Sequence, residues 1–207
     1  MNPMKVNSMV SPAIQLQGMN ADDLIKTENA LQKIKNTPTG NALLNEIREN
    51  TTNGREVQIH VHDSFTNSTI PMLTDSQLRR LNIDGNNYGQ NVMTALSLSR
   101  KRTNSQNGEG VKGIVDFNPK QAVHVDSNGV SQRIHDEELS YMSLGHELIH
   151  ALHFMRGNHI GDSRPDVNGN INYQEELRVV GLGQYANNDI TENKMRRESG
   201  LPQRLQY

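Results

Sequence analysis

Residues 143–153 read SLGHELIHALH, and within them His146, Glu147 and His150 form the pattern H-E-x-x-H. Residues four apart in a helix lie one above the other on the same face, so two such imidazoles can bind a single zinc ion through their ring nitrogens. Glu147 is rotated by about 100° around the helix axis and can reach a water on that ion rather than the ion itself. The pattern is short enough to arise by accident, so its meaning depends on the structure around it.

The sequence around the pattern favours a helix. Asp136 is expected to be its N-cap, the acidic residues 137–138 suit the positive end of the helix dipole, and residues 139–156 contain no helix breaker except Gly145. Apolar residues recur on one face at spacings of seven, three and three: Met142, Ile149, Leu152 and Met155. The alternative interpretation is an ordinary amphipathic helix whose polar face carries the three residues of the pattern by accident.

Short strands are predicted before this helix. In residues 55–63, REVQIHVHD, apolar residues 57, 59 and 61 alternate with polar ones, which is typical of a strand with one buried face. Two further strands are predicted at residues 113–117 and 121–125, and Asn118-Pro119-Lys120 between them favours a hairpin. The edge of strand 121–125 is a candidate for pairing with an extended peptide.

Helices are predicted on the N-terminal side of the strands. The first begins after Asn20 as N-cap and ends near residue 36, a second runs through residues 43–47, and another lies around residues 93–98. Residues 100–110 and 158–172 are rich in polar residues and glycine and are expected to be loops. A last helical region is expected after the second loop.

Composition limits the possible partners. The 207 residues include 21 Lys and Arg against 23 Asp and Glu, so the near-neutral charge gives no indication of nucleic-acid or membrane binding. The chain has no cysteine, which excludes disulfides, thiolate zinc sites and a cysteine nucleophile, and leaves histidines and carboxylates as the strong metal ligands. We therefore expect a protein or small-molecule partner, with no nucleic acid and no membrane involved.

Residues 1–20 carry a single charge, at Lys5, and lack both the basic segment and the continuous apolar segment of a secretory signal peptide. We expect a flexible polar arm here.

The third zinc ligand is sought after the helix. In metzincins it is a histidine six residues after the second histidine of the pattern, but that position holds Arg156 here, which also excludes an aspartate ligand at the same place. The remaining common solution is a glutamate from a later helix. The first candidates are Glu175 and Glu176, in the stretch NYQEELRVVGLG at residues 172–183.

Three stretches carry a family resemblance: HELIHALH at 146–153, EELRVVG at 175–181 and ITENKMR at 190–196. They resemble the clostridial neurotoxin light-chain metalloproteases, and residues 113–207 more closely resemble the NleD-like effector metallopeptidases that bacteria inject by type III secretion. The resemblance implies that Glu176 binds zinc and that Glu175 supports the site from behind. It also implies transition-state contacts from an R-x-x-Y pattern, which recurs here as Arg204 and Tyr207.

The other histidines are expected to lie outside the ligand set, because a catalytic zinc keeps three protein ligands and one open position. His153 is expected to face solvent or to support the site from behind the ligands. His60 and His62 share the polar face of a predicted strand and are more probable as polar-face residues than as a second metal pair. No role is assigned to the remaining three: His124, His135 and His159.

Taken with the resemblance, the residues predict an α+β, zincin-like fold of the gluzincin type, with a small mixed sheet, the H-E-x-x-H helix and C-terminal helices. Residues 21–207 form the expected zinc metallopeptidase domain, with one zinc ion per chain and Glu147 as general base. The resemblance implies a type III effector that cleaves a host signalling protein of the mitogen-activated protein kinase type in the host cytosol. Residues 1–20 then become a secretion signal, with a chaperone or the secretion apparatus as its partner. Two alternatives stay open: a non-catalytic binding module stabilised by zinc, and a zinc hydrolase acting on a non-peptide amide.

Overall fold

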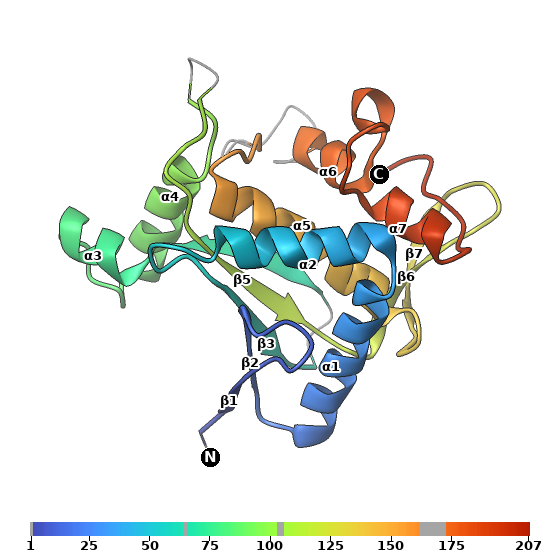
Figure 1. Ribbon diagram of the computed structural model, residues 1–207, viewed down its shortest axis with the longest axis horizontal. Coiled ribbons are helices and arrows are strands. Elements are labelled where there is room, and N and C mark those ends of the chain that lie inside the picture. Colours follow the sequence, from blue (N-terminus) through green and yellow to red (C-terminus); the bar gives the residue numbers. More distant parts are fainter. Residues whose placement is uncertain (1, 64–65, 103–105, 162–172) are drawn as a thin grey trace.

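A mixed sheet forms the centre of the fold. The computed structural model describes residues 2–63, 66–102, 106–161 and 173–207 (Figure 1). The five strands lie in the order β1-β2-β3-β5-β4, with parallel β2-β3 and β3-β5 pairs and antiparallel strands at both edges. Their bounds are β1 Met4–Asn7, β2 Ile14–Gly18, β3 Val57–Val61, β4 Ser68–Met72 and β5 Lys112–Phe117. The expected α+β class and the mixed sheet are confirmed.

Three helices cover one face of this sheet: α1 (Ala21–Lys35), α2 (Pro38–Asn50) and α5 (Ser140–Arg156) (Figure 1). The period-two pattern predicted for β3 is confirmed, because its apolar residues face these helices and its polar residues face away. The fully buried side chains of the sheet include Ile14, Leu16, Val57, Ile59, Val115 and Phe117. Against them lies α5, buried along most of its length, so the H-E-x-x-H helix is the central helix of the fold.

The starts of the helices test the capping predictions. Asn20 is the N-cap of α1 as expected, and its side chain accepts a hydrogen bond from the backbone N–H of Asp22 at 2.9 Å. Asp136 does not cap α5, which begins four residues later, and this prediction is wrong. Its carboxylate instead accepts from the backbone N–H of Leu139 at 3.0 Å and closes the turn before the helix. Gly157 ends α5 in the left-handed conformation.

The predicted hairpin of residues 113–117 and 121–125 is also wrong. Both strands exist, but β5 already has β3 and β4 on its two edges and has no free edge for another partner. The chain therefore leaves the sheet after Phe117, and β6 (Gln121–Val125) pairs with β7 (Ser131–His135) in a separate two-stranded sheet. This β6–β7 hairpin contacts α5 through β6.

The N-terminal segment corrects the expectation of a flexible arm at residues 1–20. Residues 4–7 form β1 and residues 14–18 form β2, which pairs in parallel with β3 over five residues. Ile14 and Leu16 are fully buried, because they complete the apolar face that α1 covers. The residues of β2 that face away from α1 are Gln15 and Gln17, which are half-buried. These two side chains give the segment the polar composition from which a flexible arm was expected.

Among the described residues, the remaining helices are α3 (Asp75–Leu81), α4 (Tyr88–Leu98), α6 (Tyr173–Val180) and α7 (Glu192–Glu198), and one 3-10 turn lies at Gly183–Tyr185. The helix predicted around residues 93–98 is thus the second half of α4. The predicted loop 100–110 is irregular where it is described, and the predicted loop 158–172 lies outside the described residues from residue 162 onward. Helices α6 and α7 are the expected C-terminal helices.

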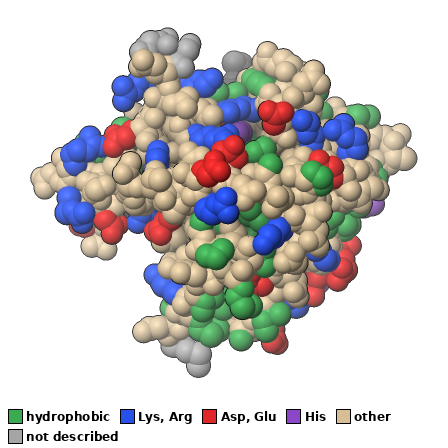
Figure 2. All heavy atoms as spheres, in the orientation of Figure 1, with side chains coloured by type: hydrophobic (Ala, Val, Ile, Leu, Met, Phe, Trp, Pro, Cys, Tyr) green, Lys and Arg blue, Asp and Glu red, His purple; other side chains and the backbone are tan. Residues whose placement is uncertain are grey.

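The surface drawn in Figure 2 carries charged side chains of both signs. Hydrophobic side chains gather at the bottom of this view, where Figure 1 shows the N-terminal strands and α1. The exposed large apolar residues of the N-terminal segment are Met4, Val6, Met9, Met19 and Ile25. Among the described residues, no helix has the length and apolar character needed to cross a membrane.

Candidate active site

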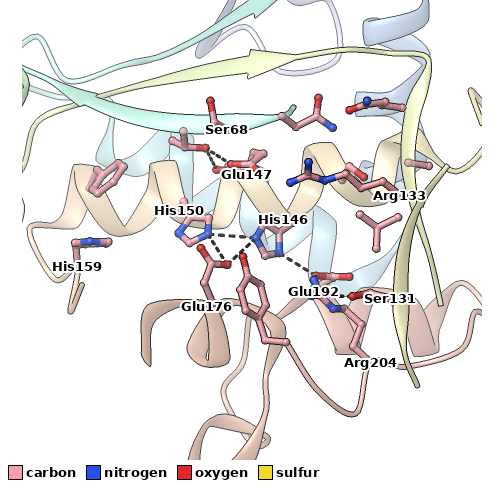
Figure 3. A pocket seen from close by; sticks show the side chains of 18 residues that line it. Ser68, Ser131, Arg133, His146, Glu147, His150, His159, Glu176, Glu192 and Arg204 are labelled. Atoms are coloured by element: carbon pink, nitrogen blue, oxygen red, sulfur yellow. Dashed lines mark hydrogen bonds and ion pairs between the residues drawn. The ribbon is translucent and has the colours of Figure 1, made fainter. Parts of the chain in front are cut away.

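Three potential metal ligands converge at the centre of a cleft (Figure 3). His146 and His150 project from adjacent turns of α5, and α6 brings the carboxylate of Glu176 against them. Glu176 Oε2 lies 3.1 Å from His146 Nε2 and 3.3 Å from His150 Nε2, and the two Nε2 atoms are 3.2 Å apart. Within the described part of the chain, this is the only group of three such ligands close enough to hold one metal ion.

The size of this triangle fits a zinc ion. Ligands about 2.0–2.1 Å from a tetrahedral zinc lie roughly 3.3–3.4 Å from one another. The three observed separations of 3.1 to 3.3 Å are close to that value. The donor set of two imidazoles and one carboxylate is also the one that hydrolytic zinc sites use.

The carboxylates around His146 favour positive charge at this point. Its Nδ1 lies 2.9 Å from Glu192 Oε2, and a carboxylate there favours the tautomer that keeps the proton on Nδ1. The Nε2 lone pair then faces a carboxylate oxygen and a second imidazole nitrogen. Burial alone would lower the pKa of His146, but the carboxylates of Glu176 and Glu192 outweigh it and raise this pKa to about 10 in the metal-free chain. The surroundings therefore stabilise positive charge at the point where the three ligands meet.

Glu175 and Glu176 point in different directions, because consecutive helical residues differ by about 100°. Glu175 is fully buried behind the ligands, 2.5 Å from His153 Nδ1, and it accepts a hydrogen bond from the backbone N–H of Ile160 at 3.1 Å. Burial lowers the pKa of His153 to about 4, despite the neighbouring carboxylate. The structure thus brings Glu176 to the histidine pair and leaves Glu175 and His153 together behind it.

Glu147 lies in the same cleft and faces β4. The Thr69 hydroxyl is 2.7 Å from Glu147 Oε2 and 2.9 Å from the backbone carbonyl of the same residue, so it can donate to either oxygen. The carboxylate is therefore held beside the histidine pair without belonging to the ligand triangle.

A buried ionic network supports His146 from α7. Glu192, whose side chain is 2% exposed, contacts His146 through Oε2 and accepts from Arg196 Nε at 2.6 Å through Oε1. Arg204 Nη1 donates to Glu192 Oε2 at 3.2 Å, so two guanidinium groups contact this one carboxylate. Burial would raise the pKa of Glu192, but His146 and the two arginines hold it well below its usual range. This network fixes the orientation of the His146 ring.

The predicted R-x-x-Y residues also line the cleft. Arg204 is buried, and the Asn193 side chain hydrogen-bonds both polar groups of its backbone. The Arg204 N–H donates to Asn193 Oδ1 at 2.8 Å, and Asn193 Nδ2 donates to the Arg204 carbonyl at 2.9 Å. The Arg204 guanidinium lies 4.8 Å from the centre of the Tyr207 ring. Burial and the Glu176 carboxylate raise the pKa of the Tyr207 hydroxyl, which keeps it protonated as a hydrogen-bond donor.

The cleft lies between β4 on one side and the β6–β7 hairpin on the other, with α5 between them. The edge of β6 was expected to pair with a peptide. One of its backbone acceptors is already engaged within the protein, because the Val123 carbonyl accepts a hydrogen bond from Arg196 Nη2 at 3.0 Å. Strand β4 is the edge of the larger sheet, and residues 67–69 at its start line the cleft.

The other histidines lie apart from the ligand triangle. His60 lies on the outward face of β3 and His62 follows that strand, with ring nitrogens 3.8 and 3.4 Å from the same Asp116 oxygen. Among the described residues, neither belongs to a group of three metal ligands. His159 is buried against Phe154, with its Nδ1 3.5 Å from Glu175 Oε1. His124 and His135 are exposed on the β6–β7 hairpin.

The family model of the M91 peptidases, described as effector protein, matches residues 14–207. The chain belongs to this family. The match begins at the first residue of β2, so it includes the strand that the sequence suggested was a flexible arm. No curated protein sequence matches this chain.

Solved structures that resemble this chain include two of Clostridium botulinum neurotoxin serotype F. Its catalytic domain is 19% identical, with a TM-score of 0.44, over 86% of this chain and 46% of that chain. A structure of its light chain is 20% identical, with a TM-score of 0.43, over 86% of this chain and 47% of that chain. The chain thus spans about half the length of these two chains.

Three residues of this candidate site were not found from the sequence: Thr69, Glu192 and Asn193. Thr69 lies 78 positions from Glu147, and only the sheet topology brings it there. Glu192 follows Thr191, the N-cap of α7, so the sequence signal was that of an ordinary helix start. Its position beside His146, across 46 residues, is a tertiary contact.

Proposed function

We propose that this chain is a zinc-dependent endopeptidase that binds one zinc ion through His146, His150 and Glu176. The single observation that carries the proposal is the triangle of their ligand atoms, with separations of 3.1 to 3.3 Å, beside a separately held glutamate in an open cleft. A bound zinc ion supplies Lewis-acid chemistry, polarising a carbonyl and lowering the pKa of a water to about 7.

Glu147 is the proposed general base. It accepts a proton from the attacking water at the carboxylate beside Thr69, and it then delivers that proton to the leaving amine nitrogen. Glu175 and Glu192 orient the site from behind: Glu192 holds the His146 ring, and Glu175, with His153, packs against the other side of the ligand pair. This division of roles leaves the ligands fixed while the base remains free to exchange a proton.

Tyr207 and Arg204 are the proposed donors to the oxyanion that forms on the scissile carbonyl. The protonated hydroxyl of Tyr207 is suited to this role. Arg204 already donates to Glu192 and to Ser131 Oγ, at 3.2 and 3.3 Å, while its buried Nε has no hydrogen-bond partner among the described residues. Arg204 therefore acts both on the electrostatics of the cleft and on the orientation of His146.

The proposed substrate is a host protein, and the resemblance to NleD-like effectors suggests a signalling protein of the mitogen-activated protein kinase type. An extended segment of it would add to the free edge of β4, which is supported by the position of residues 67–69 in the cleft. Type III secretion, a signal within residues 1–20 and a chaperone or secretion-apparatus partner belong to the same proposal. The absence of cysteine suits action in a reducing host cytosol.

The test is to incubate the zinc-loaded protein with host-cell lysate and to identify new protein N-termini by mass spectrometry, with Glu147→Ala as the matched inactive control. New N-termini that depend on Glu147 are expected. A non-catalytic binding module would bind zinc and create none. A hydrolase of side-chain amides would change the mass of peptides without breaking the backbone. Either of these results would replace the endopeptidase proposal.

A further inference from the structure

The charged side chains that line the cleft are almost all engaged within the molecule. Glu147 accepts from Thr69, Glu176 faces the two histidines, and Glu192 and Arg204 contact each other. Arg133 is the exception. It lines the cleft from β7, and among the described residues no carboxylate lies within ion-pair distance of its guanidinium.

The β6–β7 hairpin aims Arg133 at the site. Side chains two residues apart on a strand lie on the same face, about 7 Å apart. Ser131, two residues before Arg133, turns into the cleft and accepts a hydrogen bond from Arg204 Nη2 at 3.3 Å. Figure 3 shows the Arg133 side chain extending from the same strand toward Glu147. Arg133 is paired with Val123 in the hairpin, so its backbone is held by a strand rather than a loop.

The charge balance of the loaded site leaves Arg133 uncompensated. The three carboxylates that line the cleft are those of Glu147, Glu176 and Glu192. A divalent ion and Arg204 would together neutralise them, and Arg196, which also contacts Glu192, adds a further positive charge, so the positive charge of Arg133 is in excess. An exposed guanidinium that lines the cleft without an ion-pair partner is suited to binding an anion, because its planar donors match a carboxylate or a phosphate in two-point contacts.

We propose that Arg133 is a specificity-determining residue that binds an acidic side chain of the substrate, within about three residues of the scissile bond. The range follows from the strand geometry, since each peptide residue spans about 3.4 Å and the Arg133 face lies next to the ligand triangle. The anion is the carboxylate of Asp or Glu, or the phosphate of a phosphorylated side chain. This inference rests on the proposed endopeptidase function and adds the chemistry of the substrate.

The experiment compares cleavage-site preferences. A peptide library made from a cytosolic protein extract, in one untreated and one phosphatase-treated portion, is digested by the zinc-loaded wild type and by Arg133→Gln, Arg133→Lys and Arg133→Glu. Arg79→Gln, an exposed arginine on α3 that does not line the cleft, is the matched control. Zinc content and melting temperature are measured for every variant, so that a loss of folding is recognised.

For the wild type and for Arg79→Gln, we expect acidic residues to be enriched at one position near the cleaved bond. In Arg133→Gln this enrichment disappears, with kcat/KM on acidic peptides about tenfold to a hundredfold lower and KM carrying most of the change. Arg133→Lys retains part of the preference, and Arg133→Glu shifts it toward Lys and Arg. Loss of the enrichment after phosphatase treatment identifies phosphate as the anion, and its persistence identifies carboxylate.

An unchanged preference in Arg133→Gln, or wild-type cleavage without any acidic preference, would overturn the inference and leave the endopeptidase proposal intact. An equal fall in kcat on every peptide would instead assign Arg133 to the transition state. Absence of all cleavage by the wild type is the separate result that removes the proposed function, and this inference with it.

Discussion

At the scale of single residues, Glu147 illustrates how a catalytic role separates from a ligand role. It lies next to His146 in the sequence, yet its carboxylate contacts Thr69 on β4 and not the ligand triangle. Glu147→Ala should therefore retain zinc and melting temperature while peptide cleavage falls by about 10²–10⁴-fold. Glu138→Ala, at an exposed glutamate before α5, is the control for removing a carboxylate. Zinc content and kcat of both variants are the measurements, and an active Glu147→Ala would remove the proposed base.

Thr69 is the residue expected to position that base. Thr69→Val keeps the shape of the side chain but removes the hydroxyl that lies 2.7 Å from Glu147 Oε2. A hydrogen bond to a charged group contributes about 1.5–3 kcal/mol, so we expect kcat to fall by tenfold or more, with KM and zinc content unchanged. Thr69→Ser restores the hydroxyl and should restore most of kcat. Equal losses in the two variants would show that the contact matters only for packing.

At the scale of elements, the N-terminal strands differ sharply in what they contribute. Leu16 of β2 is fully buried between β3 and α1, whereas Val6 of β1, beside it in the register, is 46% exposed. Leu16→Ala should lower the free energy of unfolding by about 2–5 kcal/mol, and Val6→Ala by much less. Urea denaturation of the two variants compares them directly. Equal, small effects would restore the interpretation of residues 1–20 as a flexible arm.

The C-terminal segment is anchored by Asn193 and by a hydrogen bond of 3.1 Å from the Leu205 N–H to the Gly129 carbonyl. Asn193 on α7 makes both hydrogen bonds to the backbone of Arg204, which places Arg204 and the Tyr207 hydroxyl at the cleft. Tyr207→Phe should lower kcat by about 10²-fold with little change in KM, since an oxyanion donor acts as charge develops. Asn193→Ala should reduce kcat as well, because the same donor is then less well positioned. Near wild-type kcat in Tyr207→Phe would return this residue to a structural role.

At the scale of the whole molecule, zinc is expected to connect α5 to the C-terminal helices. Removing it with a chelator leaves three converging polar groups without their partner, so the melting temperature should fall. A ligand at a free concentration about a thousand times its Kd stabilises the folded state by about 4 kcal/mol. Calorimetry of the zinc-loaded and metal-free protein measures this, and His146→Ala should behave like the metal-free protein. His60→Ala, outside the triangle, should retain one zinc per chain.

Local sequence patterns determined the position of several helices and strands of this protein. The period of 3.6 around Met142 and Ile149, the alternation in β3 and the cap at Asn20 each correspond to an element in the structure. These signals succeed because they record which side of a single element is buried, and that preference is written within a few consecutive residues. The H-E-x-x-H spacing belongs to the same class, since one helical turn is enough to bring His146 and His150 together.

Only the tertiary structure decided which distant groups meet. The residues of the sequence did not decide whether Glu175 or Glu176 is the third ligand. The orientation of α6 against α5 places Glu176 at the histidine pair and buries Glu175 behind it. The contacts of Thr69 with Glu147 and of Glu192 with His146 depend on strand order and helix packing across 78 and 46 residues. The separation of β6 from β5 depends on edges that other strands already occupy. The physical reason is the same throughout: a short segment records its own burial, but not the identity of the surface that buries it.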